Sequence, residues 1–165
     1  MTTLYLIQDG VLAAIAAIGF ATVSHPPRSV YVCCSLTAAI GHACRYLLMN
    51  NSIYAMHIIP ASGLAAFLIG TLAVFIAPRI KCPAEACFSP ALLPMIPGMY
   101  AYRSFKALLL CLFQQENMYG HYLYLLVNNG LNAAFIVLAL VVGATLPIFL
   151  FKKISIQATR KIRNH

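Results

Sequence analysis

The chain has 165 residues, of which 62% are hydrophobic and 8% are charged, and its mean hydropathy is +0.85. Because about a quarter of the residues in soluble domains are charged, this composition excludes an ordinary soluble enzyme and predicts a membrane protein. The net charge of +8 does not indicate nucleic-acid binding, since the sequence offers no continuous soluble face for a basic stripe.

Apolar runs long enough to cross a bilayer, about 20 residues each, occur five times along the chain. The predicted spans are residues 4–23, 30–49, 58–77, 84–113 and 122–151. The last run exceeds what a bilayer requires, so it must tilt, bend or protrude. We therefore expect an all-α integral membrane protein, with a bundle of about five transmembrane helices in residues 1–151 and a basic cytoplasmic tail in residues 152–165.

The basic residues are distributed unevenly among the connections between these spans. They occur at Arg28, at Arg79 and Lys81, and in the tail, but not in connections 50–57 and 114–121. Since basic connections stay in the cytoplasm, the pattern predicts a multi-pass protein with its N-terminus outside and its C-terminus inside. Tyrosines would then mark the two membrane interfaces, with Tyr5, Tyr46, Tyr54, Tyr119 and Tyr122 at the outer one and Tyr31 at the inner one.

Small residues recur every three or four positions in the first and third spans. The two sets are Gly10, Ala13, Ala17 and Ala21, and Gly63, Ala66 and Gly70. Each set forms one stripe along its helix and permits close helix packing. Packing explains these residues, so we assign them no chemistry.

Asp9 and Arg45 are expected at the same depth in the outer half of two neighbouring antiparallel helices, given a rise of about 1.5 Å per residue. An ion pair between them would serve either the structure or the coupling of transport to an ion. His42 lies one turn deeper on the Arg45 face. It is either a satisfied interior hydrogen bonder or a group that handles protons.

The later spans carry further polar residues in their outer halves, namely Arg103, Lys106, Asn128 and Asn132. Charges in hydrocarbon usually face a bundle interior or a watery cavity, so we expect a polar layer suited to an anionic group. The asparagines, four residues apart on one face, could instead hydrogen-bond between helices, and Lys106 could extend outward to the interface.

The fourth span contains the sequence Pro94-Met95-Ile96-Pro97-Gly98, which predicts an interruption of the helix. Such breaks are tolerated where the backbone faces protein or a cavity. Transporters use them to direct the positive end of a half-helix at a substrate carboxylate. Here the half-helix would begin near Met99, with Arg103 one turn along; the alternative is an ordinary kinked helix.

Six cysteines are present, but none forms a C-x-x-C pair. Cys82 and Cys87 have a spacing that only weakly indicates a metal site, and free thiols explain them as well. We expect no metal and no cofactor. The sequence also lacks H-E-x-x-H and paired acids, so it does not predict an enzyme.

Three motifs, in this order and spacing, resemble those of the threonine/serine exporter family, specifically its small split (YjjB-like) subunit. They are Gln8-Asp9 followed by Leu12-Ala13-Ala14-Ile15 and Gly19-Phe20, then Gly41-His42-x-x-Arg45 followed by Leu48-Met49, then Leu93-Pro94-Met95-Ile96-Pro97-Gly98 followed by Tyr100. The resemblance runs from about Gln8 to Phe151, which is nearly the whole chain.

The resemblance implies an inner-membrane exporter made of two different chains, with a larger membrane subunit as the partner. It implies a small-molecule substrate such as threonine, serine or succinate, and coupling to the proton-motive force. The matching positions are Asp9, His42, Arg45, Pro94, Pro97 and Gly98, whereas Arg103 and Lys106 lie outside the family pattern. A higher oligomer remains open.

Two other functions compete with this expectation. The chain could be a non-catalytic scaffold that only stabilises its larger partner. It could also be an intramembrane enzyme, which would need a nucleophile–base pair or a metal cluster at depth. The sequence offers one intramembrane aspartate and one mid-span histidine for that purpose.

Overall fold

The computed structural model describes residues 2–51, 55–113 and 118–151. Within these ranges the chain forms helices and contains no strand, which confirms the predicted all-α class. The predicted interface residue Tyr54 and the predicted basic tail, residues 152–165, lie outside the described residues. The elements are α1 (Thr2–Val23), α2 (Arg28–Met49), α3 (Ile58–Ile80), α4 (Ala84–Leu92), the 3₁₀ turn η1 (Leu93–Met95), α5 (Gly98–Phe113) and α6 (Tyr119–Leu150).

Among the described residues, four helices are long and apolar enough to cross a membrane, namely α1, α2, α3 and α6. The remaining apolar segment, predicted as one span, is divided into α4, of 9 residues, and α5, of 16 residues. Neither piece reaches the length of about 20 residues that a bilayer requires. The chain is an integral membrane protein whose fourth predicted span is discontinuous.

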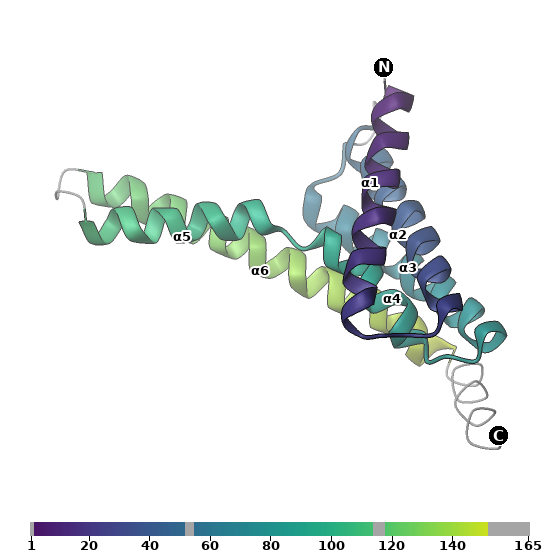
Figure 1. Ribbon diagram of the computed structural model, residues 1–165. Coiled ribbons are helices and arrows are strands. Elements are labelled where there is room, and N and C mark those ends of the chain that lie inside the picture. The colour runs from purple at the N-terminus through teal and green to yellow at the C-terminus, as the bar shows by residue number, and fades with distance from the viewer. Residues whose placement is uncertain (1, 52–54, 114–117, 152–165) are drawn as a thin grey trace. The chain divides into compact units, whose positions relative to one another are not determined.

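The chain forms two compact units. Unit 1 comprises Met1–Met95 and Ala139–His165, and so contains α1 to α4, η1 and the end of α6. Unit 2 comprises Ile96–Leu138, and so contains α5 and the first part of α6 (Figure 1). The proline-rich break therefore falls where unit 1 gives way to unit 2.

Unit 1 is held together by small residues at helix contacts. Ala13, Ala17 and Ala21 are 3%, 0% and 0% exposed, so the predicted stripe of α1 is buried. Farther along the same stripe, a Cβ placed on Gly10 would lie 3.5 Å from the carbonyl oxygen of Ala39 in α2. Close contact of this kind maximises van der Waals packing where lipid provides no hydrophobic driving force.

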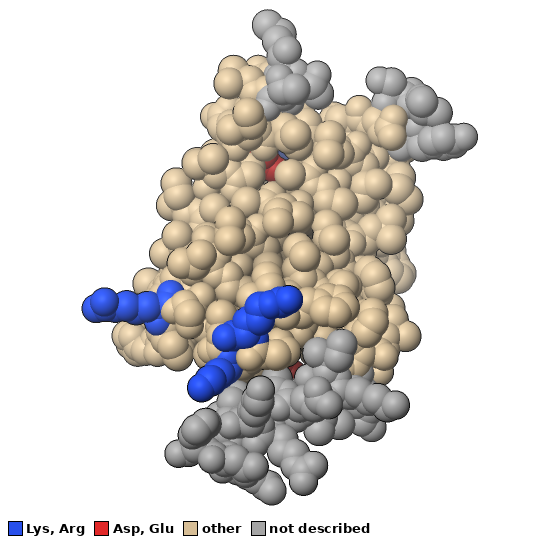
Figure 2. Space-filling view, turned by 90° about the vertical axis from the view of Figure 1, so that its right-hand side faces the viewer, with Lys and Arg blue, Asp and Glu red and all other residues tan. Residues whose placement is uncertain are grey.

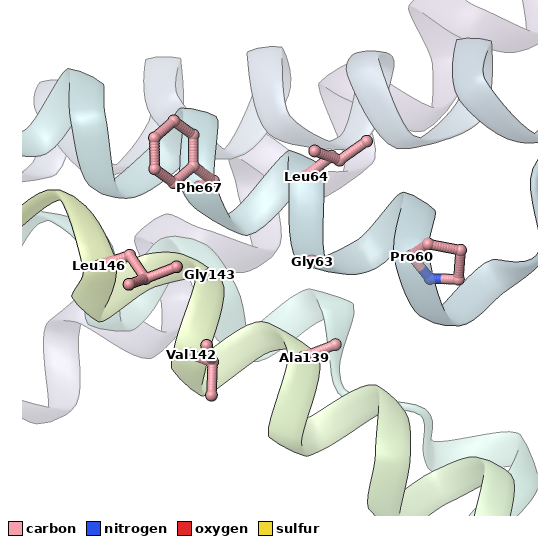
Figure 3. A pocket seen from close by; sticks show the side chains of 8 residues that line it. All are labelled: Pro60, Gly63, Leu64, Phe67, Ala139, Val142, Gly143 and Leu146. Atoms are coloured by element: carbon pink, nitrogen blue, oxygen red, sulfur yellow. The ribbon is translucent and has the colours of Figure 1, made fainter.

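The contact between α3 and the end of α6 is closer still. A Cβ on Gly143 would lie 2.3 Å from the carbonyl oxygen of Gly63, and a Cβ on Gly70 would lie 2.4 Å from that of Ala144. The two backbones therefore touch. The flanking larger side chains leave a shallow groove of about 420 Å³ between these helices (Figure 3). Its lining is entirely apolar and consists of Pro60, Gly63, Leu64, Phe67, Ala139, Val142, Gly143 and Leu146.

The exposed basic residues of unit 1 lie in connections at the same ends of the helices. Arg28 begins α2, while Arg79 and Lys81 close α3, and all three are exposed. Val30 and Cys82 share one buried cluster, which places these two connections next to each other. Figure 2 shows Lys and Arg side chains gathered toward one end of a face on which acidic atoms are sparse.

Unit 2 is an antiparallel helical hairpin in which few of the described residues are buried. The hydroxyl of Ser104 in α5 donates a hydrogen bond of 3.0 Å to the carbonyl oxygen of Leu126 in α6. The same hydroxyl oxygen would lie 3.1 Å from a Cβ on Gly130. The Leu126–Gly130 side of α6 therefore faces α5, and the opposite side of α6 faces away from it.

Replacing Gly143 by alanine should destabilise the protein, because the added methyl group would overlap the backbone of Gly63. Overpacking of this kind costs about 1–3 kcal/mol, which a thermal melt of the purified protein in detergent should show as a lower Tm. Gly19→Ala is the matched control, since nothing lies within 4 Å of its Cβ position. Equal melting temperatures for the two variants would contradict the close α3–α6 contact.

Candidate functional site

The ionisable side chains of unit 1 that come together inside the predicted spans are Asp9 and His42. Oδ2 of Asp9 lies 3.4 Å from Nδ1 of His42. His42 is 5% exposed, whereas the Asp9 side chain is 42% exposed. The pair thus joins a buried imidazole to a carboxylate that reaches the surface of the unit.

Both imidazole nitrogens of His42 are buried, and neither meets hydrogen-bond geometry with any described residue. Unpaired polar atoms inside a protein are costly, and natural proteins keep few of them without a purpose. The 3.4 Å separation places the Asp9 carboxylate within ion-pair distance of the imidazole, and the two would attract each other as an ion pair only when His42 is protonated. His42 therefore retains the capacity to donate and accept protons.

Arg45 lies one turn beyond His42 on α2 and connects that helix to the proline-rich break. Its Nη1 donates a hydrogen bond of 3.3 Å to the backbone carbonyl oxygen of Met95, the last residue of η1. The helix does not resume until Gly98. A charged donor from α2 thus satisfies a carbonyl at the point where regular helical hydrogen bonding is interrupted.

The local sequence explains how α2 presents these side chains. Gly41 precedes His42, and a Cβ at Gly41 would lie 2.3 Å from the side chain of Ile69 in α3. The missing side chain lets α2 approach α3 closely. Since His42 and Arg45 are three residues apart, they project from one face of α2 toward α1 and η1.

The sequence predicts that Asp9 and Arg45 face each other. Among the described residues, the Asp9 carboxylate lies nearest to His42, while Arg45 hydrogen-bonds to Met95 and still interacts electrostatically with Asp9. Asp9 and Arg45 were expected at the same depth, but Asp9 contacts His42, which lies one turn deeper on α2. The long Arg45 side chain instead reaches the 3₁₀ turn, whose position next to α2 no sequence pattern indicated.

The break itself divides between the two units. Pro94 and Met95 belong to unit 1, and Pro97 and Gly98 belong to unit 2. The α5 helix begins at Gly98, one residue before the predicted start. The backbone amides of Tyr100 and Ala101 both donate to the carbonyl oxygen of Pro97 at 3.1 Å. These two amides are therefore already engaged in the first turn of the half-helix.

The remaining predicted site residues all belong to unit 2. Arg103, Lys106 and Asn128 are exposed, and Asn132 is half-buried. Nδ2 of Asn132 donates to the backbone oxygen of Asn128 at 2.8 Å and to its Oδ1 at 3.2 Å. The two asparagines share one face of α6, as their spacing predicted, and these hydrogen bonds run within the helix.

Three buried polar residues were not anticipated from the sequence, namely Thr37, Ser62 and Asn129. Ser62 is 0% exposed, and its hydroxyl has no hydrogen-bond partner among the described residues. Asn129 is 9% exposed and donates from Nδ2 to the carbonyl oxygen of Leu125 at 2.7 Å. Ser62 lies on the buried side of α3 next to the small residues Gly63 and Ala66, and the sequence pattern does not distinguish a serine there from a packing residue.

The cysteines form no disulfide; all six are free. Sγ of Cys34 donates to the carbonyl oxygen of Cys87 at 3.1 Å, which joins α2 to α4. Burial raises the pKa of the Cys82 thiol, so it stays protonated at neutral pH. Within the described ranges, no three His, Cys, Asp or Glu side chains are arranged to hold a metal ion.

The α3–α6 groove does not suit a charged metabolite, because each of its lining residues is apolar. The Asp9–His42–Arg45 group is different in kind. It offers a carboxylate, an imidazole and a guanidinium whose other N–H groups point to no described acceptor in the structure. Such a set can exchange a proton and attract an anion inside a membrane span.

Comparison with known proteins places the chain in a recognised family. A family model described as threonine/serine exporter, ThrE, matches residues 9–150. An uncharacterised protein of Haemophilus influenzae is 34% identical over 151 residues, which cover 90% of this chain and 48% of that relative. The chain thus spans about half the length of the curated relative it matches. No solved structure matches the chain.

Arg45→Gln should destabilise unit 1, because a neutral side chain replaces the charged donor to the Met95 carbonyl. Hydrogen bonds from charged groups contribute about 1.5–3 kcal/mol. Arg79→Gln is the matched control, since Arg79 donates to the carbonyl oxygen of Phe75 at an exposed position, where such contacts contribute at most about 1 kcal/mol. Thermal melts in detergent compare the two, and an equal loss would show that the Arg45 contact does not brace the break.

Proposed function

Because the chain belongs to the threonine/serine exporter family, we propose that it is one subunit of a two-component secondary exporter of small carboxylate-bearing metabolites. Threonine, serine and succinate are the expected cargo, and the proton-motive force is the expected driving force. The observation that carries this proposal is the contact of 3.4 Å between Asp9 and the buried His42 within apolar, membrane-length helices.

Asp9 and His42 form the proton-handling pair in this proposal. A carboxylate that is 42% exposed can receive a proton from a watery opening, and the buried imidazole beside it can pass one onward. Protonation of Asp9 removes its attraction for a charged His42. Entry of a proton would therefore loosen the contact between α1 and α2 and favour a change of access state.

Arg45 provides the attraction for the substrate carboxylate. One of its guanidinium nitrogens is engaged by the Met95 carbonyl, and guanidinium carries five N–H donors in all. A substrate carboxylate bound to the remaining N–H groups of Arg45 would change the strength of the hydrogen bond between Arg45 and Met95. Substrate binding is thereby linked to the break between α4 and α5, the element that we expect to move.

The length of the relative and the positions of the basic residues bear on the partner of this chain and on its orientation in the membrane. The relative from Haemophilus influenzae is about twice as long as the matched region, which supports a second polypeptide as the partner of this chain; we propose that this partner is a larger membrane subunit. The exposed basic residues Arg28, Arg79 and Lys81 support a cytoplasmic position for the connections after α1 and α3. We place the complex in the bacterial inner membrane, with the N-terminus of this chain outside.

Asp9→Asn and His42→Ala should each reduce export of the substrate by more than about tenfold, since general proton transfer by a positioned side chain contributes 10²–10⁴-fold. The measurement is the rate at which cells preloaded with threonine, serine or succinate release each compound into the medium. The larger subunit is co-produced throughout, and membrane abundance of both chains is checked.

Glu85→Gln is the matched control for this experiment, because Glu85 is an exposed acid at the start of α4 and contacts none of the three site residues. Export should continue at the normal rate in that variant. If Asp9→Asn and His42→Ala also export normally at equal abundance, the chain acts as a scaffold for its partner and the assignment of these residues is wrong.

A further inference from the structure

The face of α6 that points away from α5 carries an exposed stripe with the spacing of a helix–helix seam. Its members follow one another at intervals of four, three, four and three residues and are Tyr124, Asn128, Leu131, Phe135 and Leu138. The four apolar members are 65%, 53%, 51% and 57% exposed, and Asn128 is exposed as well. Alternation of three and four is the spacing at which helices pack by knobs into holes. We call these five residues the α6 seam.

The position of α5 shows that the α6 seam has no partner within unit 2. Ser104 of α5 packs against Leu126 and Gly130. At 3.6 residues per turn, Asn128 lies on the opposite side of α6 from these two residues. The hairpin therefore covers one side of α6 and leaves the seam open.

An open apolar stripe alone would need no cover in a membrane, because lipid is as apolar as leucine. Asn128 changes this conclusion. It lies nine residues after the start of α6, which is about 14 Å at a rise of 1.5 Å per residue, near the middle of a hydrocarbon core about 30 Å thick. Its Oδ1 accepts from Asn132, while its own Nδ2 has no hydrogen bond within the described part of the chain.

A side-chain amide is self-complementary, because it carries both a donor and an acceptor. Two copies of one membrane protein also have the same orientation in the bilayer, so a two-fold axis along the membrane normal places identical residues at the same depth. Asn128 of one copy would then meet Asn128 of the second copy, flanked by the apolar members of the seam. A different partner would have to supply an amide at this depth independently.

We propose that the α6 seam is the contact between two copies of this chain, with hydrogen bonds between the Asn128 amides setting its register. A polar residue in an otherwise apolar seam is the device by which helix pairs fix register and number of strands. This inference does not rest on the exporter function. It predicts self-association whether or not the chain transports anything.

The test uses the full chain in two fluorescently labelled populations, reconstituted into phosphatidylcholine vesicles at decreasing protein-to-lipid ratios. Energy transfer between the labels should persist on dilution for the unaltered chain. Asn128→Leu should weaken association about tenfold, as expected for the loss of an interhelical amide hydrogen bond. Asn128→Gln, which keeps an amide, should retain most of the association.

Val137→Ala is the matched control for packing, since Val137 is exposed on α6 but lies outside the seam, whereas Leu131→Ala should weaken association. If a variant folds poorly, cysteine cross-linking replaces the dilution series. In a chain whose six native cysteines are replaced by serine, Leu131→Cys should form a cross-linked dimer in membranes, and Val137→Cys should not. Unchanged association in Asn128→Leu, or association that requires a different membrane protein, would overturn the proposal.

Discussion

The structure depends on one constraint, which is that polar groups within hydrocarbon must be satisfied by the protein itself. Few such groups occur in this chain, and unit 1 places three of them together. Asp9 contacts His42, and Arg45 contacts the Met95 carbonyl. Because an isolated charge in the bilayer is expensive, these contacts position α1, α2 and the proline-rich break relative to one another. The residues that brace the bundle are thus the same ones to which we assign proton handling in the proposed exporter.

Close packing of small residues makes this arrangement possible. Gly41 lets α2 approach α3, and Gly143 lets α6 touch the backbone of α3. Regular helical structure is interrupted between Met95 and Gly98, which is also where unit 1 gives way to unit 2. Discontinuous helices of this kind are typical of the substrate sites of secondary transporters.

Hydropathy and charge predicted the helical membrane class, and small-residue spacing predicted the buried stripe of α1, because these signals are local and repeat along the chain. The partner of Asp9 was not predictable in the same way. Depth alone matched Asp9 with Arg45, but the contact depends on which turn of α2 meets α1 and on the reach of a long side chain to η1. Ser62 was missed because serine resembles glycine and alanine in a packing stripe.

Unit 2 raises the same constraint in a different form. Its hairpin has polar residues on outward faces, with Arg103 and Lys106 exposed on α5 and Asn128 exposed on α6. In water such exposure is ordinary, but in a bilayer it leaves donors without acceptors. A hairpin of this composition is stable in a membrane only if other protein or a watery cavity covers it. Unit 1 brings Asp9 to His42 and Arg45 to the Met95 carbonyl, whereas unit 2 leaves Arg103, Lys106 and Asn128 on its surface. The same constraint therefore requires cover for unit 2 from other protein or from water.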